Sequence, residues 1–197
     1  MIHEISKLES VFFQRKTAVV AQDLLGKFLV RKVGKGILSG MIVETEAYVG
    51  PHDLACHAAK GKTERTKVMF EPAGIWYVYM IYGMYHCLNI VTEAKGHPSA
   101  VLIRALEPDF FLPSRDIACY VPTNGPGKLC RALKIDKKLN CTSALAHNAK
   151  LFIEDRGIKI PQNKIQKAKR IGVDYAGKWK NKPLRFYIKG NKFVSKN

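Results

Sequence analysis

The stretch IVETEAYVGPHDLACH, residues 42–57, brings carboxylates, a tyrosine and histidines together around a single predicted turn. Its first half is rich in apolar residues and extended in character, and side chains along a strand alternate between its two faces. Glu44, Glu46 and Tyr48 therefore share one face of the predicted strand. Two carboxylates lie close together on that face, which makes it the first candidate for a functional site.

The elements around this stretch predict a sheet that begins with an antiparallel hairpin. Residues 17–25 are expected to form a short helix that ends at a glycine. Residues 27–33 and 37–48 predict two strands, joined by a Gly-Lys-Gly turn. Beyond the second strand, Asp53 is expected to cap a short helix that brings His57 back towards the strand end.

A second hairpin is predicted for residues 76–92, WYVYMIYGMYHCLNIVT, with its turn near Gly83. Large side chains such as Tyr82 at a hairpin tip are unusual, because apolar groups in a loop leave water only if something covers them. One interpretation is that the aromatic side chains form the core of a sheet. The other is a wedge or stacking surface for nucleobases, since every base has a π-face.

Arg104 is the single cation in SAVLIRAL, residues 99–106, which predicts another strand. A buried arginine needs a carboxylate or phosphate partner, and Glu46 is the candidate. The loop at residues 124–127, Asn-Gly-Pro-Gly, precedes a predicted helix at 128–135, which is either an anion-binding helix start or an ordinary one. Further strands are predicted at residues 151–156, 170–175 and 184–189.

The charge of the chain is large and unevenly distributed. The 197 residues carry a formal net charge of +17. Residues 1–127 hold 14 Lys and Arg against 12 Asp and Glu, whereas residues 128–197 hold 19 against 4. A surface this basic favours a polyanion, and nucleic acid is the leading candidate. An anionic membrane surface and a solvated, lysine-rich surface are the alternatives.

Composition places the chain among globular proteins of a reducing compartment. An apolar content of 47% is enough for a core, and the length predicts one domain over residues 1–197. The sequence contains neither the pattern of a signal peptide nor an apolar run of about 18 residues, so we expect a cytoplasmic protein with no membrane segment. Disulfides and standard zinc sites are poorly supported by the spacing of the cysteines, which are Cys56, Cys87, Cys119, Cys130 and Cys141.

Five stretches follow one another with a recognisable spacing: VETEAYVGPHDLACH, YVYMIYGMYHCLNI, AVLIRALEP, NGPGKLCRAL and RIGVDYAGKWKNKPLRFYIKG. Together they resemble the alkyladenine (3-methyladenine) DNA glycosylase family, the mammalian-type enzymes that also occur in bacteria. The likeness runs from about Thr17 to Ser195, so it rests on most of the chain. It implies a bacterial member with a mixed α/β (α+β) fold, in which a curved, mainly antiparallel sheet is flanked by helices and a protruding β-hairpin intercalates into DNA.

The resemblance also implies an activity. Such an enzyme is a monofunctional glycosylase of base-excision repair that flips damaged purines out of duplex DNA. Its expected substrates are 3-methyladenine and 7-methylguanine, with deaminated and etheno purines as further candidates. It hydrolyses the N-glycosidic bond with a water that a glutamate activates, and leaves an abasic site. No cofactor and no metal are expected, because water is the nucleophile. The expected partner is double-stranded DNA, with the protein monomeric and close to the bacterial nucleoid.

Site residues are carried over by position in the matching stretches. Glu46 matches the catalytic glutamate and Arg104 the arginine that positions the water, with the main-chain carbonyl of Val173 as a third contact. The other matches are Tyr48 and Tyr79 on the faces of the flipped purine, His57 at its edge, Asn89 crowding the amino group of normal guanine, and Tyr82 with Met84 filling the gap in the duplex.

Two residues depart from the family pattern. His86 stands where a bulky aromatic residue is common, and Asp174 stands where glycine is expected. An acid near the attacking water or a DNA phosphate would change the substrate range or the affinity.

Three other functions are alternatives to this one. A non-catalytic nucleic-acid-binding protein would use the basic residues and the hairpin, but gives Glu46 and Arg104 no joint role. A metal-dependent nuclease would use Glu44 and Glu46 as ligands and would be inhibited by a chelator. A glycosidase acting on neutral carbohydrate has no use for the positive charge.

Overall fold

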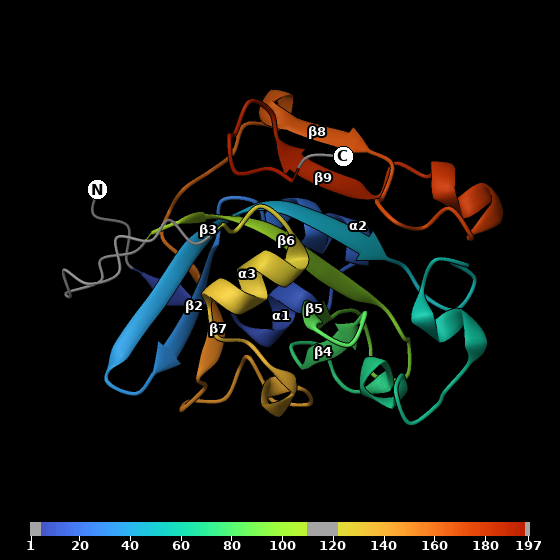
Figure 1. Ribbon diagram of the computed structural model, residues 1–197, viewed down its shortest axis with the longest axis horizontal. Helices are drawn as coiled ribbons and strands as arrows, with labels where there is room; N and C mark the ends of the chain where they lie inside the picture. Colours follow the sequence, from blue (N-terminus) through green and yellow to red (C-terminus); the bar gives the residue numbers. More distant parts are fainter. Residues whose placement is uncertain (1–4, 110–121, 196–197) are drawn as a thin grey trace.

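The computed structural model describes residues 5–109 and 122–195, within which nine strands belong to one sheet (Figure 1). The strands are β1 (Ser6–Lys7), β2 (Phe28–Val33), β3 (Gly36–Tyr48), β4 (Trp76–Ile81), β5 (Tyr85–Val91), β6 (Ala100–Pro108), β7 (Leu151–Asp155), β8 (Ile165–Ala168) and β9 (Arg185–Ile188). The α-helices are α1 (Ser10–Phe13), α2 (Thr17–Asp23) and α3 (Pro126–Ala132). Short 3-10 helices are η1 (His57–Lys60), η2 (Lys67–Phe70), η3 (Lys137–Leu139), η4 (Gln162–Lys164) and η5 (Gly177–Asn181). The predicted mixed α/β class with an antiparallel sheet is confirmed; Cys119 lies outside the described residues.

The sheet is organised by β3, which is 13 residues long. One edge of β3 pairs with β6, whereas the other pairs first with β2 and then with β9. The change of partner coincides with a shift in register around Glu44, and such a bulge bends a strand. The sheet therefore curls, and the β8–β9 hairpin lies along the upper side of β3 and β6 in Figure 1.

Helices cover the apolar side of this sheet. The helix α2 packs on β3, where the Thr45 hydroxyl donates to the Ala21 carbonyl at 2.7 Å. The helix α3 packs on β5 and β6 and lies in front of them in Figure 1. Trp76 is fully buried beneath, and its indole N–H donates to the Leu151 carbonyl at 2.9 Å. Residues from both halves of the chain thus share one core, and the acid-bearing face of β3 is turned away from α2.

The second predicted hairpin is confirmed as β4 paired with β5. Its turn is closed by the Met84 N–H, which donates to the Ile81 carbonyl at 3.2 Å. Tyr82 and Gly83 both have positive φ angles, 51° and 68°, as a tight hairpin turn requires. Tyr82 is left 85% exposed at the tip.

One strand prediction in the C-terminal third is wrong, and one strand of the structure is missing from the predictions. Residues 170–175 form a loop, not a strand. Their alternating apolar side chains, which suggested a strand, instead line a pocket described below. The strand β8 was not predicted, because this lysine-containing strand pairs with β9 alone and buries none of its side chains fully.

The predicted capping role of Asp53 is also wrong. The helical turn η1 begins at His57, and Cys56 is its N-cap. The Asp53 carboxylate accepts N–H bonds from Val49 and Ala55 within its own loop. Asp53 thus orders the turn after β3, because its carboxylate bonds to N–H groups of that turn and not to those of the helix.

A buried ion pair joins this turn to the loop at residues 170–175. Both Arg170 terminal nitrogens reach the Asp53 carboxylate, at 2.6 and 2.8 Å, and neither side chain is exposed. Arg170 also donates to the Ala47 carbonyl at 2.9 Å. Two loops that are far apart in sequence are therefore fixed to each other and to the end of β3.

We expect Asp53→Asn to lower the free energy of unfolding by about 3–5 kcal/mol, because it leaves the Arg170 charge buried without its partner. Urea denaturation followed by fluorescence measures the change. Glu64→Gln is the control, since the Glu64–Lys67 pair is exposed and its loss should leave the midpoint unchanged. Equal midpoints for the two variants would contradict the structural importance of the buried pair.

Candidate active site

A pocket of about 240 Å³ lies between the sheet and the loops at residues 49–56 and 170–175. Strands β3, β4, β5 and β6 together supply half of its lining residues. The predicted site residues that line it are Tyr48, His57, Tyr79, Tyr82, Asn89 and Val173. Glu46 and Arg104 lie directly behind this wall, and Met84 is exposed at the hairpin tip. The structure thus brings together residues that lie far apart in the sequence.

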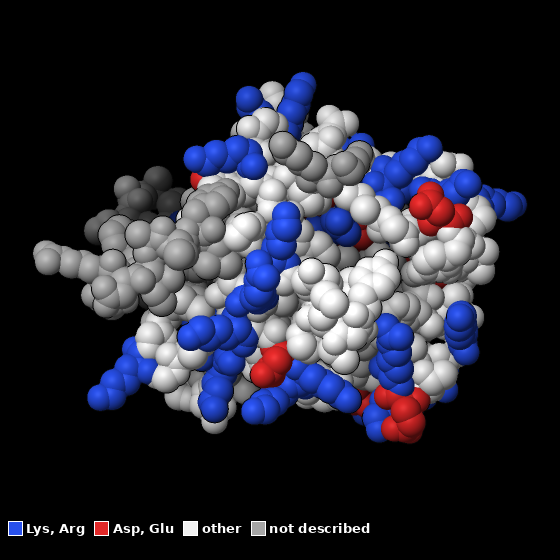
Figure 2. Space-filling model, viewed as in Figure 1, with Lys and Arg blue, Asp and Glu red and all other residues white. Residues whose placement is uncertain are grey.

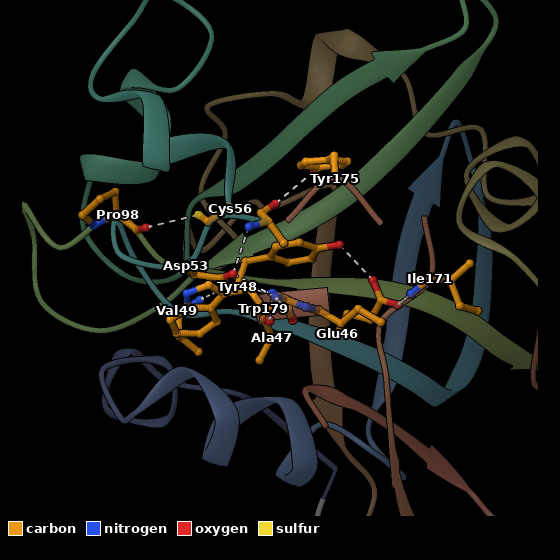
Figure 3. Close-up of polar contacts among 12 residues, drawn as sticks. Glu46, Ala47, Tyr48, Val49, Asp53, Cys56, Pro98, Ile171, Tyr175 and Trp179 are labelled. Atoms are coloured by element: carbon orange, nitrogen blue, oxygen red, sulfur yellow. Dashed lines mark hydrogen bonds and ion pairs between the residues drawn. The ribbon is translucent and has the colours of Figure 1, made fainter. Parts of the chain in front are cut away.

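Glu46 is fully buried, and two hydrogen-bond donors and one cation hold its carboxylate. The Ile171 N–H donates to Oε1 at 2.8 Å and the Tyr48 hydroxyl donates to Oε2 at 2.9 Å (Figure 3). Arg104 Nη1 lies 3.3 Å from Oε1, so the predicted Glu46–Arg104 pair is present. Both Tyr48 and Ile171 line the pocket, so Glu46 is one side chain away from its interior.

Glu44 lies on the other side of Arg104 and is equally buried. Its Oε1 is 3.3 Å from Arg104 Nε and 3.4 Å from Arg185 Nη1. Ser195 adds two donors, its N–H at 2.8 Å and its hydroxyl at 2.9 Å. Arg104 is therefore held between two carboxylates, and Glu44 is held by the C-terminal segment.

These contacts decide the electrostatics of Glu46. Burial raises the pKa of Glu46 above its ordinary value, because the charged form loses water. The positive charge of Arg104 opposes this rise, as do the hydrogen bonds from Ile171 and Tyr48. Two opposing effects thus act on the Glu46 carboxyl group: desolvation favours its neutral form, and these three groups favour its ionised form.

Tyr48 and Tyr79 present two aromatic rings to the pocket. Burial raises the pKa of both phenols well above the usual value, so both keep their protons. The hydroxyl of Tyr48 can consequently act as the donor to Glu46 that the distance indicates. The guanidinium of Arg170 lies over the Tyr48 ring, 4.7 Å from its centroid, and fixes that ring from behind.

His57 stands beside these rings, with its centroid 4.7 Å from that of Tyr79 in an edge-on arrangement. Its Nδ1 is 2.9 Å from the Tyr77 hydroxyl. Burial, together with the positive charges of Arg65 and Lys60, lowers the pKa of His57 to about 4. The imidazole is therefore neutral at physiological pH, and Nε2 remains for a ligand.

Two further predicted residues are anchored by the backbone. The Asn89 amide donates to the Tyr77 carbonyl at 3.2 Å, across the β4–β5 hairpin. The Val173 carbonyl accepts the Ala176 N–H at 3.0 Å. A carbonyl oxygen has two lone pairs, so one remains for a water molecule.

Several residues of the site were not found from the sequence. Tyr77 and Tyr175 line the pocket, and the Ile171 backbone contacts the buried acid. The aromatic richness of residues 76–82 is a signal for Tyr77, which alternates with its neighbours along β4. A backbone N–H leaves no signal in the sequence, so the role of Ile171 needs the fold.

Neither departure from the family pattern lies inside the pocket. His86 is half-buried opposite Met80 in the hairpin and does not line the pocket. Asp174 is exposed between Val173 and Tyr175, which do line it. Any influence of Asp174 therefore has to act from the pocket rim.

Lys and Arg side chains are spread over the face of the molecule shown in Figure 2, where acidic side chains form only a few isolated groups. Within residues 5–109 and 122–195, no helix has the length and apolar character to cross a membrane. The same ranges contain no cluster of three or more His, Cys, Asp or Glu side chains poised to hold a metal ion. An aromatic pocket beside a buried carboxylate, on a surface rich in Lys and Arg, is suited to an enzyme that acts on bases in nucleic acid.

Comparison with known proteins identifies the family. The family described as methylpurine-DNA glycosylase matches residues 11–192. A Legionella pneumophila protein named "Putative 3-methyladenine DNA glycosylase" is 51% identical over 190 residues, which cover 96% of this chain and 98% of the relative. Relatives of the same name from Myxococcus xanthus (47% identical, covering 96% and 93%) and Methanocella arvoryzae (48%, covering 94% of each) are also similar. The chain belongs to the methylpurine-DNA glycosylase family.

We expect the His57 imidazole to titrate with a pKa of about 4, because burial and two nearby cations disfavour its charged form. NMR titration of the ring protons measures this, and the resonance that disappears in His57→Gln gives the assignment. A midpoint close to the ordinary 6.5 would show that the ring is solvated or paired with an acid.

Proposed function

We propose that the protein excises methylated purines, 3-methyladenine and 7-methylguanine, from duplex DNA by means of a water activated by Glu46. Membership of the methylpurine-DNA glycosylase family makes it a DNA glycosylase, an enzyme of DNA repair that hydrolyses N-glycosyl bonds. The observation that carries the mechanism is the fully buried Glu46 carboxylate, held by Arg104 and adjoining an aromatic pocket.

Access to the base comes first. A base inside the stack has to be flipped out, at a cost of a few kcal/mol that is lowest for damaged or mispaired bases. Tyr82, exposed beside the pocket, is suited to fill the gap from the minor groove, with Met84 next to it. Tyr48 and Tyr79 then stack on the flipped purine, while Asn89 limits the space for the amino group of normal guanine.

Hydrolysis follows in the pocket. The C1′–N bond breaks and its electron pair leaves with the base, while the water oxygen bonds to C1′ and passes a proton to Glu46. The Glu46 carboxylate also stabilises the positive charge that develops on the sugar. Arg104 and the Val173 carbonyl orient the water. The product is an abasic site, and the reaction needs no lysine nucleophile.

Lesions differ in the help that they need. Alkylation at N3 or N7 makes the purine cationic, so it leaves as a neutral molecule and requires little besides flipping and an activated water. Neutral hypoxanthine and etheno purines leave less readily, because the departing base gains negative charge. A hydrogen-bond donor in the pocket is then required, and His57 is the candidate.

The contacts of the two acids favour this function over that of a metal-dependent nuclease. The Glu44 and Glu46 oxygens already meet Arg104, Arg185 and Ser195. Cations and N–H donors in those positions repel or displace a metal ion. We also propose that the protein acts as a single domain over residues 1–197, as a monomer, in the cytoplasm and on the nucleoid.

We expect Glu46→Gln to lower the rate of base release by at least about 100-fold while binding to a lesion duplex persists, because the amide cannot accept the proton of water. The assay uses duplexes with hypoxanthine or etheno-adenine and methylated genomic DNA, in EDTA, and scores free base and alkali-labile sites. The exposed Glu71→Gln is the matched control with full activity. If wild type binds DNA but releases no base, the binding-protein alternative replaces the enzyme.

We expect Tyr82→Ala to slow base release from a fully paired lesion duplex more than from a duplex in which the lesion is mispaired, because a mispaired base costs less to flip. Single-turnover rates on the two duplexes measure the ratio. Met80→Ala, an exposed residue of β4, is the control. Equal slowing on both duplexes would remove Tyr82 from the flipping step.

A further inference from the structure

The walls of the pocket differ in their charge. The buried acids are each matched by a cation: Glu46 by Arg104, Glu44 by Arg185 as well, and Asp53 by Arg170. The Arg170 guanidinium that backs the Tyr48 ring is therefore neutralised by its own carboxylate. The Tyr48 side of the pocket carries no excess charge.

The Tyr79 side is different because of Arg65. The Arg65 guanidinium lies over the Tyr79 ring, 5.0 Å from its centroid. In the part of the chain that the structure describes, Arg65 makes no ion pair, and the adjacent Glu64 is bound to Lys67 at 2.7 Å. An unneutralised cation therefore rests against one of the two rings of the pocket.

The position of Arg65 relative to the pocket follows from the lining residues. Arg65 lies in an adjoining cleft together with Lys60 and Thr63, and it does not line the base pocket. Tyr79 lines the base pocket and not the cleft. The guanidinium thus reaches the Tyr79 ring from outside the base pocket that this ring lines.

The field of Arg65 reaches the wall residues. After burial, Arg65 is the next largest influence on the pKa of His57 and acts in the same direction, which disfavours a positive charge there. Lys60 adds to this effect, and among the residues that the structure describes no acid opposes it. A positive charge placed in the pocket beside His57 meets the same repulsion.

We propose that Arg65 is a specificity-determining residue that lowers the affinity of the pocket for cationic purines relative to neutral ones. An aromatic face attracts a cation through its negative π-cloud, and a second cation on the opposite face weakens that attraction. The inference rests on the proposed function, in which Tyr79 stacks on the flipped base.

Arg65 should discriminate between cationic and neutral lesions when the flipped base binds, and not when the glycosidic bond breaks. Cleavage lowers the charge on the base by one unit whether the base begins as a cation or as a neutral purine. A fixed positive charge favours both departures to the same degree. Removing Arg65 should change the ratio of half-saturation constants for the two kinds of lesion and leave the ratio of maximal rates unchanged.

The test compares duplexes that differ only in the lesion, cationic 7-methylguanine or neutral hypoxanthine. Single-turnover kinetics with enzyme in excess give a half-saturation constant and a maximal rate for each. We expect Arg65→Gln to shift the ratio of half-saturation constants by about 2- to 5-fold towards 7-methylguanine. Arg65→Lys, which keeps the charge, should retain most of the wild-type ratio.

Lys62→Gln is the matched control for loss of one positive charge. Lys62 belongs to the same loop, but its ammonium lies over Phe70, which is not in the pocket. Loss of a phosphate contact should weaken both substrates equally and leave the ratio unchanged. An unchanged ratio in Arg65→Gln, or an equal shift in Lys62→Gln, would overturn the proposal.

Failure of the proposed function is distinguishable from failure of this inference. If wild type releases neither base, the glycosylase mechanism fails, whatever Arg65 does. Equilibrium binding of the two duplexes in the Glu46→Gln background reports the same affinity ratio without any chemistry. A shift on adding Arg65→Gln in that background supports the role of Arg65, and no shift rejects it.

Discussion

The ion-pair chain Glu44–Arg104–Glu46 is the interaction on which the rest of the site depends. Two carboxylates on adjacent same-face positions of one strand repel each other, and burial makes this worse. Arg104 from β6 lies between them, and both acids stay in the protein interior because of it. The bulge in β3 lies at Glu44, where β9 brings Arg185 to the same acid. The curl of the sheet and the charge balance of the site therefore have a common origin.

Two loops that strand pairing does not hold in place complete the pocket beside these ion pairs. The turn after β3 and the loop at residues 170–175 carry most of the polar contacts, and the Asp53–Arg170 pair connects them. Their rigidity matters because the same loop supplies the Ile171 N–H to Glu46 and the Val173 side of the pocket. If this loop moved away, the Glu46 carboxylate would lose the hydrogen bond from the Ile171 N–H.

Much of the fold could be predicted, since the β2–β3 and β4–β5 hairpins have clear alternation and turn residues. The pairing of Arg104 with Glu46 followed from a lone cation in an apolar strand. The strand prediction at residues 170–175 was wrong because the alternating apolar side chains there line a pocket. The capping prediction for Asp53 was wrong because its carboxylate pairs with the distant Arg170. Contacts made by backbone N–H groups, or across more than a hundred residues, leave no local pattern.

The hydrogen bonds from Ser195 to Glu44 have a consequence for the synthesis of the protein. The two residues are 151 positions apart. At about 5–20 residues per second, a ribosome adds Ser195 roughly 8 to 30 seconds after Glu44. Until Ser195 is added, the nascent chain holds a strand in which the Glu44 carboxylate lacks these two hydrogen bonds. Maturation of the site therefore waits for the synthesis of a residue 151 positions downstream of the acid.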